Sequence, residues 1–142
     1  MTMTSTDVPR PEVCDRRDRR ITMFVWPETQ CVRSVRRAVK AILGYWGIAH
    51  LADDAELLTT ELLTNAIRHT GGEQSVRVTI AAGQRWLSID VRDCSASAPR
   101  PHRPTACEES GRGLLLIERI AGSWTYRFHP DGTKTVSCRL PL

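Results

Sequence analysis

The sequence predicts an α+β fold, a two-layer sandwich in which a mixed or antiparallel sheet is covered on one face by three helices. At 142 residues, 41% of them hydrophobic, the chain is long enough for one domain with one core. Hydrophobic periodicity gives the order strand, helix, helix, strand, strand, loop, helix, strand, strand, with hairpins as the main connections. A doubly wound nucleotide-binding fold requires regular βαβ alternation, and this order lacks it.

The first two expected elements are a short strand and an amphipathic helix. Residues 21–26 alternate in a run rich in β-forming side chains that ends at Pro27. Apolar residues then recur at spacings of three and four until Gly47, which predicts a helix. Its other side carries cations, which indicate a solvated face or, alternatively, a partner-contacting patch: Arg33, Arg36, Arg37 and Lys40.

A second helix is expected over residues 53–70 and a hairpin after it. Asp53 or Asp54 can cap the helix, and Gly71-Gly72 supplies a stop signal. Residues 76–80 and 87–91 alternate between apolar and polar side chains on either side of a turn at Gly83-Gln84. This pattern predicts two antiparallel strands.

Residues 94–110 are expected to form a long irregular loop. Three prolines and several small polar residues exclude a helix there, and loops of this length are usually lids or binding loops. A third helix is expected over residues 111–121. Alternating strands over 124–128 and 136–140, joined by the turn Pro130-Asp131-Gly132, complete the chain.

Composition limits the class of protein. Residues 1–19 are polar and charged and predict a flexible N-terminal tail before one domain over residues 20–142. There is no apolar stretch of the roughly 18 residues that a membrane span requires, and no apolar block near the start to act as a signal peptide. Five cysteines without a C-x-x-C pair favour a reducing compartment, so we expect a cytoplasmic protein. A net charge of +4, spread along the chain, does not indicate nucleic-acid binding.

Two polar residues interrupt the apolar pattern of the second helix. Glu61 and Asn65 are four apart and therefore project from the same side. An amide oxygen suits Mg²⁺, and a carboxylate one turn away can accept a proton. A solvent-facing helix edge is the alternative.

Asp93 and the glycines at positions 111 and 113 are further candidates for a binding site. A carboxylate at the end of a strand can accept a hydrogen bond from an exocyclic amine such as that of adenine, or it can merely cap the following turn. Gly111-x-Gly113 before a helix presents backbone N–H groups that suit phosphate, although such a pair is also common in ordinary turns.

The order and spacing of four motifs resemble the GHKL ATPases. In order, they are similar to the N box, the adenine-binding aspartate, the glycine box and the terminal threonine motif, and they span most of residues 21–142. The motifs are Glu61-Leu62-Leu63-Thr64-Asn65-Ala66, Val91-Arg92-Asp93, Gly111-Arg112-Gly113-Leu114 and Gly132-Thr133-Lys134-Thr135-Val136. The chain looks most like the anti-sigma-factor serine/threonine kinases, especially the stand-alone actinobacterial ATP-binding proteins.

The resemblance implies a Bergerat-type ATP-binding fold with ATP and Mg²⁺ as cofactors. It implies that Asn65 ligands Mg²⁺, that Glu61 is the general base and that Asp93 binds the adenine amine. The remaining implied nucleotide contacts are Gly111, Gly113 and Leu114 on the phosphate side and Thr135 on the adenine side. Arg112 is a catalytic candidate that could steady the developing phosphate charge, as Arg100 or Arg103 could from the lid; these three are placed by proximity and charge alone.

The resemblance also implies a function. It is the phosphorylation of an anti-sigma-factor antagonist on serine or threonine, which regulates transcription by partner switching with a sigma factor; relatives are often homodimers. The chain departs from the family pattern at Ser95 and Ser97, where glycines are usual, and at Leu115 in the glycine box. The alternative is therefore a non-catalytic module that sequesters a sigma factor or antagonist.

Overall fold

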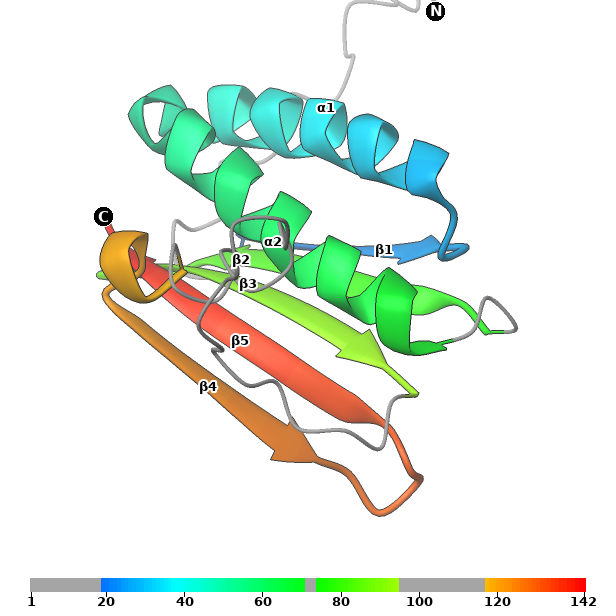
Figure 1. Ribbon diagram of the computed structural model, residues 1–142. Coiled ribbons are helices and arrows are strands. Elements are labelled where there is room, and N and C mark those ends of the chain that lie inside the picture. Colours follow the sequence, from blue (N-terminus) through cyan, green and yellow to red (C-terminus); the bar gives the residue numbers. More distant parts are fainter. Residues whose placement is uncertain (1–18, 71–73, 95–116) are drawn as a thin grey trace, which may run out of the picture.

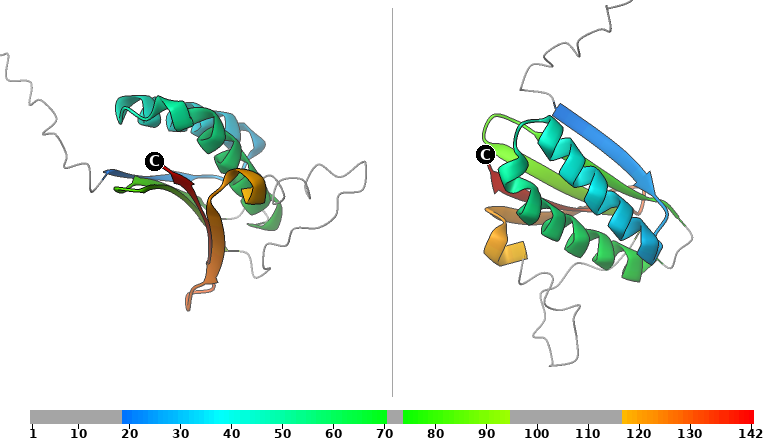
Figure 2. Two further views of the ribbon diagram at one scale, coloured as in Figure 1. Left: turned by 90° about the vertical axis from the view of Figure 1, so that its left-hand side faces the viewer. Right: turned by 90° about the horizontal axis from the view of Figure 1, so that it is seen from above.

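The computed structural model describes residues 19–70, 74–94 and 117–142, which form two layers. A five-stranded sheet has the strand order β1-β2-β3-β5-β4, and every neighbouring pair is antiparallel. The two long helices lie together on one face of this sheet (Figures 1 and 2). The expected α+β class is therefore confirmed, with an antiparallel sheet.

The elements follow the expected order closely. Of the third expected helix, residues 111–121, only 117–120 are described as helical. The bounds are β1 Arg19–Val25, α1 Thr29–Tyr45, the 3-10 helix η1 Ala49–Leu51, α2 Ala52–Thr70, β2 Val76–Ala82, β3 Trp86–Asp93, β4 Ser123–Phe128 and β5 Lys134–Pro141.

Helix α1 packs one stripe against the sheet and exposes the other. Val35, Val39 and Leu43 recur at a spacing of four and are buried. The helix ends where Gly47 adopts a φ of 76° and the Ile48 N–H donates to the Leu43 carbonyl at 2.9 Å. A positive φ at glycine with this bond satisfies carbonyls that the last turn leaves open. The four cations of α1 are all exposed.

Helix α2 begins differently from the sequence-based expectation. It starts at Ala52, directly after η1, so Asp53 and Asp54 lie inside its first turn and are not the cap. Two carboxylates in the first turn still interact favourably with the positive end of the helix dipole. No helix in residues 19–70, 74–94 or 117–142 is long and apolar enough to cross a membrane.

The centre of the core lies between α2 and the middle of the sheet. Strand β3 lies between β2 and β5, and its Leu87, Ile89 and Val91 point toward the helices with at most 1% of each side chain exposed. Intervening residues of β3 point to the opposite face, which neither long helix covers (Figure 2).

We expect Ile89→Ala to lower the free energy of unfolding by about 2–5 kcal/mol, because it leaves a cavity at a fully buried position of the core. Phe24→Ala, at a position 66% exposed, is the matched control and should cost much less. Urea denaturation of both variants measures the difference. Equal losses would contradict this placement of the core.

Candidate functional site

Glu61, at the midpoint of α2, and Asn65 lie one turn apart on this helix, which runs toward the end of β3 (Figure 1). Both side chains are half-buried, whereas their neighbours Leu62, Leu63 and Ala66 are buried in the core. The pair therefore sits at the border of the core, where a carboxylate and an amide can reach a ligand without being enclosed. The alternative interpretation, in which both side chains simply face solvent at the edge of the helix, is not observed.

Asp93 is the last residue of β3 and is buried on the side of the sheet that faces the helices. Its register partner on β5 is Lys134. The Lys134 Nζ lies 3.9 Å from the Asp93 Oδ2, and both side chains are only 3% exposed. A carboxylate and an ammonium thus face each other at the end of the sheet near α2.

Lys134 lies beside the predicted site residue Asp93, and the sequence-based prediction did not include it. The hydrophobic alternation of β5 contained the signal, because Val136, Cys138 and Leu140 point to the core and a residue two positions before Val136 must do the same. Lys134 also pairs with Phe128 of β4. Asp93, Lys134 and Phe128 therefore lie side by side on the face of the sheet that the helices cover.

Thr135 does not join this group. Alternation along β5 places it on the face away from the helices, where it lines a hollow with Ser137 and Arg139. Its hydroxyl oxygen lies 2.6 Å from the His129 Nε2. The structure thus brings Asp93 together with Lys134 and leaves the side chain of Thr135 on the opposite face.

The turn between β4 and β5 is held by a compact polar network. The Thr133 hydroxyl and backbone N–H both donate to the Asp131 Oδ1, at 2.6 and 3.0 Å, and Gly132 has a φ of 85°. Arg92 donates to the Thr133 Oγ1 at 2.8 Å and to the Asp131 Oδ2 at 2.7 Å. The Thr133 hydrogen bonds and, secondarily, the Arg92 charge lower the pKa of Asp131 to about 2. This network fixes the start of β5 and therefore the position of Lys134.

The other predicted site residues lie outside the described part of the chain. They are Gly111, Arg112, Gly113 and Leu114, together with Arg100 and Arg103 of the expected lid. Among the described residues, no group of three or more His, Cys, Asp or Glu side chains could hold a metal ion. Asn65 nonetheless fits Mg²⁺, which usually keeps several waters and is bound through few protein ligands together with substrate phosphates.

Burial of Lys134 predicts an unusual pH dependence of stability. Burial lowers the pKa of Lys134 from 10.5, and the Asp93 charge only partly opposes this. With a folded pKa below the unfolded one, the unfolded chain binds more protons between the two values, so this lysine makes stability rise with pH toward 10.5. At pH values below the pKa of Lys134 in the folded protein, the loss of stability caused by burying its charge is fully present.

We therefore expect wild-type stability to rise more steeply than that of Lys134→Met between neutral pH and pH 10.5. Chemical denaturation at several pH values measures the two slopes. An exposed replacement, Lys40→Met, is the control and should follow the wild type. If the stabilities of Lys134→Met and the wild type changed in parallel with pH, the lowered pKa of Lys134 would be contradicted.

Comparisons with known proteins agree with this architecture. The histidine kinase-like ATPase domain matches residues 25–138. No curated protein matches the chain. A chain from the crystal structure of the SiaB–SiaC complex from Pseudomonas aeruginosa is similar over 89% of this chain and 92% of its own, with a TM-score of 0.58 and 16% identity. That likeness shows a shared fold, and the domain match, which covers most of the sequence, shows that the chain belongs to the family of histidine kinase-like ATPase domains.

Proposed function

We propose that the protein is an ATP-dependent serine/threonine kinase that phosphorylates an anti-sigma-factor antagonist and regulates transcription by partner switching. The observation that carries this proposal is the buried carboxylate of Asp93 at the end of β3, close to the helix that bears Glu61 and Asn65, in a member of this ATPase family. A buried carboxylate at a strand end is suited to accept a hydrogen bond from the adenine amine.

The proposed roles divide the site into a base-binding end and a phosphate-binding end. Asp93 binds the adenine amine, Asn65 supplies an amide oxygen to Mg²⁺ and Glu61 accepts the proton of the substrate hydroxyl. Magnesium, when bound, neutralises phosphate charge. Gly111, Gly113 and Leu114 are assigned to the phosphates by the sequence motif alone, and Arg112 by its proximity and charge.

Lys134 takes the place on β5 that the motif resemblance gave to Thr135. It shares the Asp93 face, and its ammonium group can donate to a ring nitrogen of the base while Asp93 accepts from the amine. We therefore assign no adenine contact to the Thr135 side chain.

The proposed partners are a sigma factor and its antagonist. The similar chain from Pseudomonas aeruginosa comes from a structure of a two-protein complex, which supports a function through protein binding. We further propose that the protein acts in the cytoplasm, where both partners would be found, and that it can form a homodimer.

The alternative is a module that binds partners without catalysis. The observation that favours it is the ion pair itself, because Lys134 already contacts the carboxylate that adenine would need. The two functions differ in one assay. Incubation with Mg-ATP and candidate antagonists, followed by mass spectrometry, should show phosphoserine or phosphothreonine on one antagonist. A stable complex that forms and never gains phosphate, while ATP is present, would favour sequestration.

A further inference from the structure

The uncovered face of the sheet carries a row of residues in register across all five strands. Arg20 of β1 pairs with Ala81, Ala81 with Ser88 and Ser88 with Arg139, and Ser123 of β4 completes the row. Ala81, Ser88 and Arg139 each lie between two core residues of their strands, so their side chains project away from the helices. Arg20 and Ser123 are in register with Ala81 and Arg139 and therefore project from the same face. The row therefore places two small residues between two arginines.

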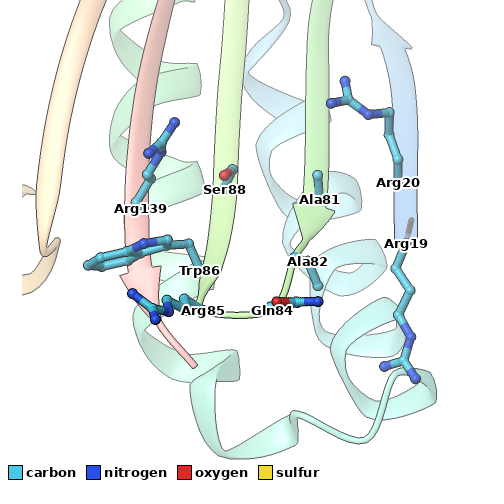
Figure 3. A pocket seen from close by; sticks show the side chains of 10 residues that line it. Arg19, Arg20, Ala81, Ala82, Gln84, Arg85, Trp86, Ser88 and Arg139 are labelled. Atoms are coloured by element: carbon cyan, nitrogen blue, oxygen red, sulfur yellow. The ribbon is translucent and has the colours of Figure 1, made fainter. Parts of the chain in front are cut away.

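The small residues form the floor of a shallow trough. Neighbouring strands are about 4.8 Å apart, so three strand spacings put the backbones of Arg20 and Arg139 about 14 Å apart. Figure 3 shows the two guanidinium groups on either side of Ser88 and Ala81, with Trp86 and Arg85 at one end. The hollow has a volume of about 570 Å³. We call these six residues the arginine trough.

The arginine trough is strongly positive. Arg20, Arg85 and Arg139 are all exposed, and none forms a salt bridge with a carboxylate in residues 19–70, 74–94 or 117–142. Arg127 borders the adjoining hollow, in which Asp90 is the one acidic side chain. Elsewhere on this face, Arg92 is neutralised by Asp131 and Arg77 stacks over Phe24. The trough thus brings together three arginines whose charge no carboxylate of the described residues neutralises.

We propose that the arginine trough binds an acidic helical segment of a partner protein. A guanidinium group binds a carboxylate through two parallel hydrogen bonds, so the two walls fit carboxylates on both flanks of the bound segment. The separation of about 14 Å matches a helix of about 10–12 Å diameter. Trp86, with 38% of its surface exposed, provides an apolar contact at one end.

A second copy of the chain is a poorer occupant. A symmetric dimer through this face would place arginines of one copy against arginines of the other, which is unfavourable. The proposal does not depend on nucleotide binding, because the trough lies on the opposite face of the sheet from Asp93 and Lys134.

The test uses a short fluorophore-labelled, alanine-rich peptide that forms a helix and carries glutamates along two sides of it, and fluorescence anisotropy of the full chain without nucleotide measures its binding. The Arg20→Glu/Arg139→Glu variant should bind about ten- to a hundredfold more weakly than the wild type. The control Arg33→Glu/Arg37→Glu makes the same change of charge on the exposed side of α1 and should bind like the wild type. Arg20→Ala/Arg139→Ala provides a milder variant if the charge reversal unfolds the chain.

The results of this experiment distinguish an acidic helical partner from non-specific attraction and from nucleic acid. Selective loss in the trough variants supports the proposal. Equal weakening in both charge-reversal variants would reveal only general attraction to a basic protein, and it would overturn the proposal, as would absence of peptide binding. A duplex DNA probe that binds the wild type and competes with the peptide would make the face a nucleic-acid surface and also overturn it.

Discussion

Glu61→Ala is expected to lower the rate of phosphoryl transfer by about 10²–10⁴-fold, the usual contribution of a positioned general base. Binding of ATP should change little, because the base acts on the substrate hydroxyl and not on the nucleotide. The structure supports this separation of roles. Glu61 is half-buried at the midpoint of α2, whereas Asp93 lies at the end of β3 in the other layer.

Glu56→Ala is the matched control for this prediction. Glu56 lies in the same helix and is also half-buried, but it is more than one turn away from Glu61, so its loss should leave transfer intact. Single-turnover transfer with saturating Mg-ATP measures the chemical step for each variant. Transfer that survives in Glu61→Ala at the wild-type rate would show that another group accepts the proton.

The second large effect is expected at Asp93. Loss of a hydrogen bond to a charged group costs about 1.5–3 kcal/mol, which corresponds to roughly ten- to a hundredfold weaker ATP binding in Asp93→Ala. The same change leaves Lys134 buried beside a missing carboxylate, and breaking such a pair costs about 3–5 kcal/mol of stability. Weak binding by this variant alone would therefore not distinguish a binding role from a structural one.

A double variant separates the two effects. Asp93→Ala/Lys134→Met removes both members of the pair, so stability should largely recover. Its ATP binding should stay weaker than that of Lys134→Met, which keeps the Asp93 carboxylate. Asp90→Ala is the control, since Asp90 lies on the same strand but on the opposite face. If the double variant regained wild-type affinity, Asp93 would have no role in binding the base.

The fold was largely predictable because local patterns and tertiary structure agree in most elements. Strand alternation in β2 and β3 marks the buried side correctly, and the apolar stripe of α1 is the stripe that packs. The start of α2 was not predictable from Asp53 and Asp54, since a capping residue and a first-turn acidic residue give similar sequence signals. Here η1 supplies the preceding turn.

The candidate site was predicted less completely. The motif led to Thr135, whereas the pairing of β5 with β3 brings Lys134 opposite Asp93. A buried lysine is rare enough that polarity suggests a solvent-facing position, and only the register shows otherwise. The network of Arg92, Asp131 and Thr133 joins residues about forty positions apart, and no local pattern in the sequence indicates such a contact.

Calorimetric titration of the wild type with Mg-ATP, alongside Asp93→Ala, Asp93→Ala/Lys134→Met and the Asp90→Ala control, tests the central proposal most directly. The proposed function predicts micromolar binding to the wild type and to Asp90→Ala, with affinity lost or strongly reduced in Asp93→Ala and in the double variant. Absence of binding heat at millimolar Mg-ATP at two temperatures, or equal affinities for the wild type and Asp93→Ala, would contradict it.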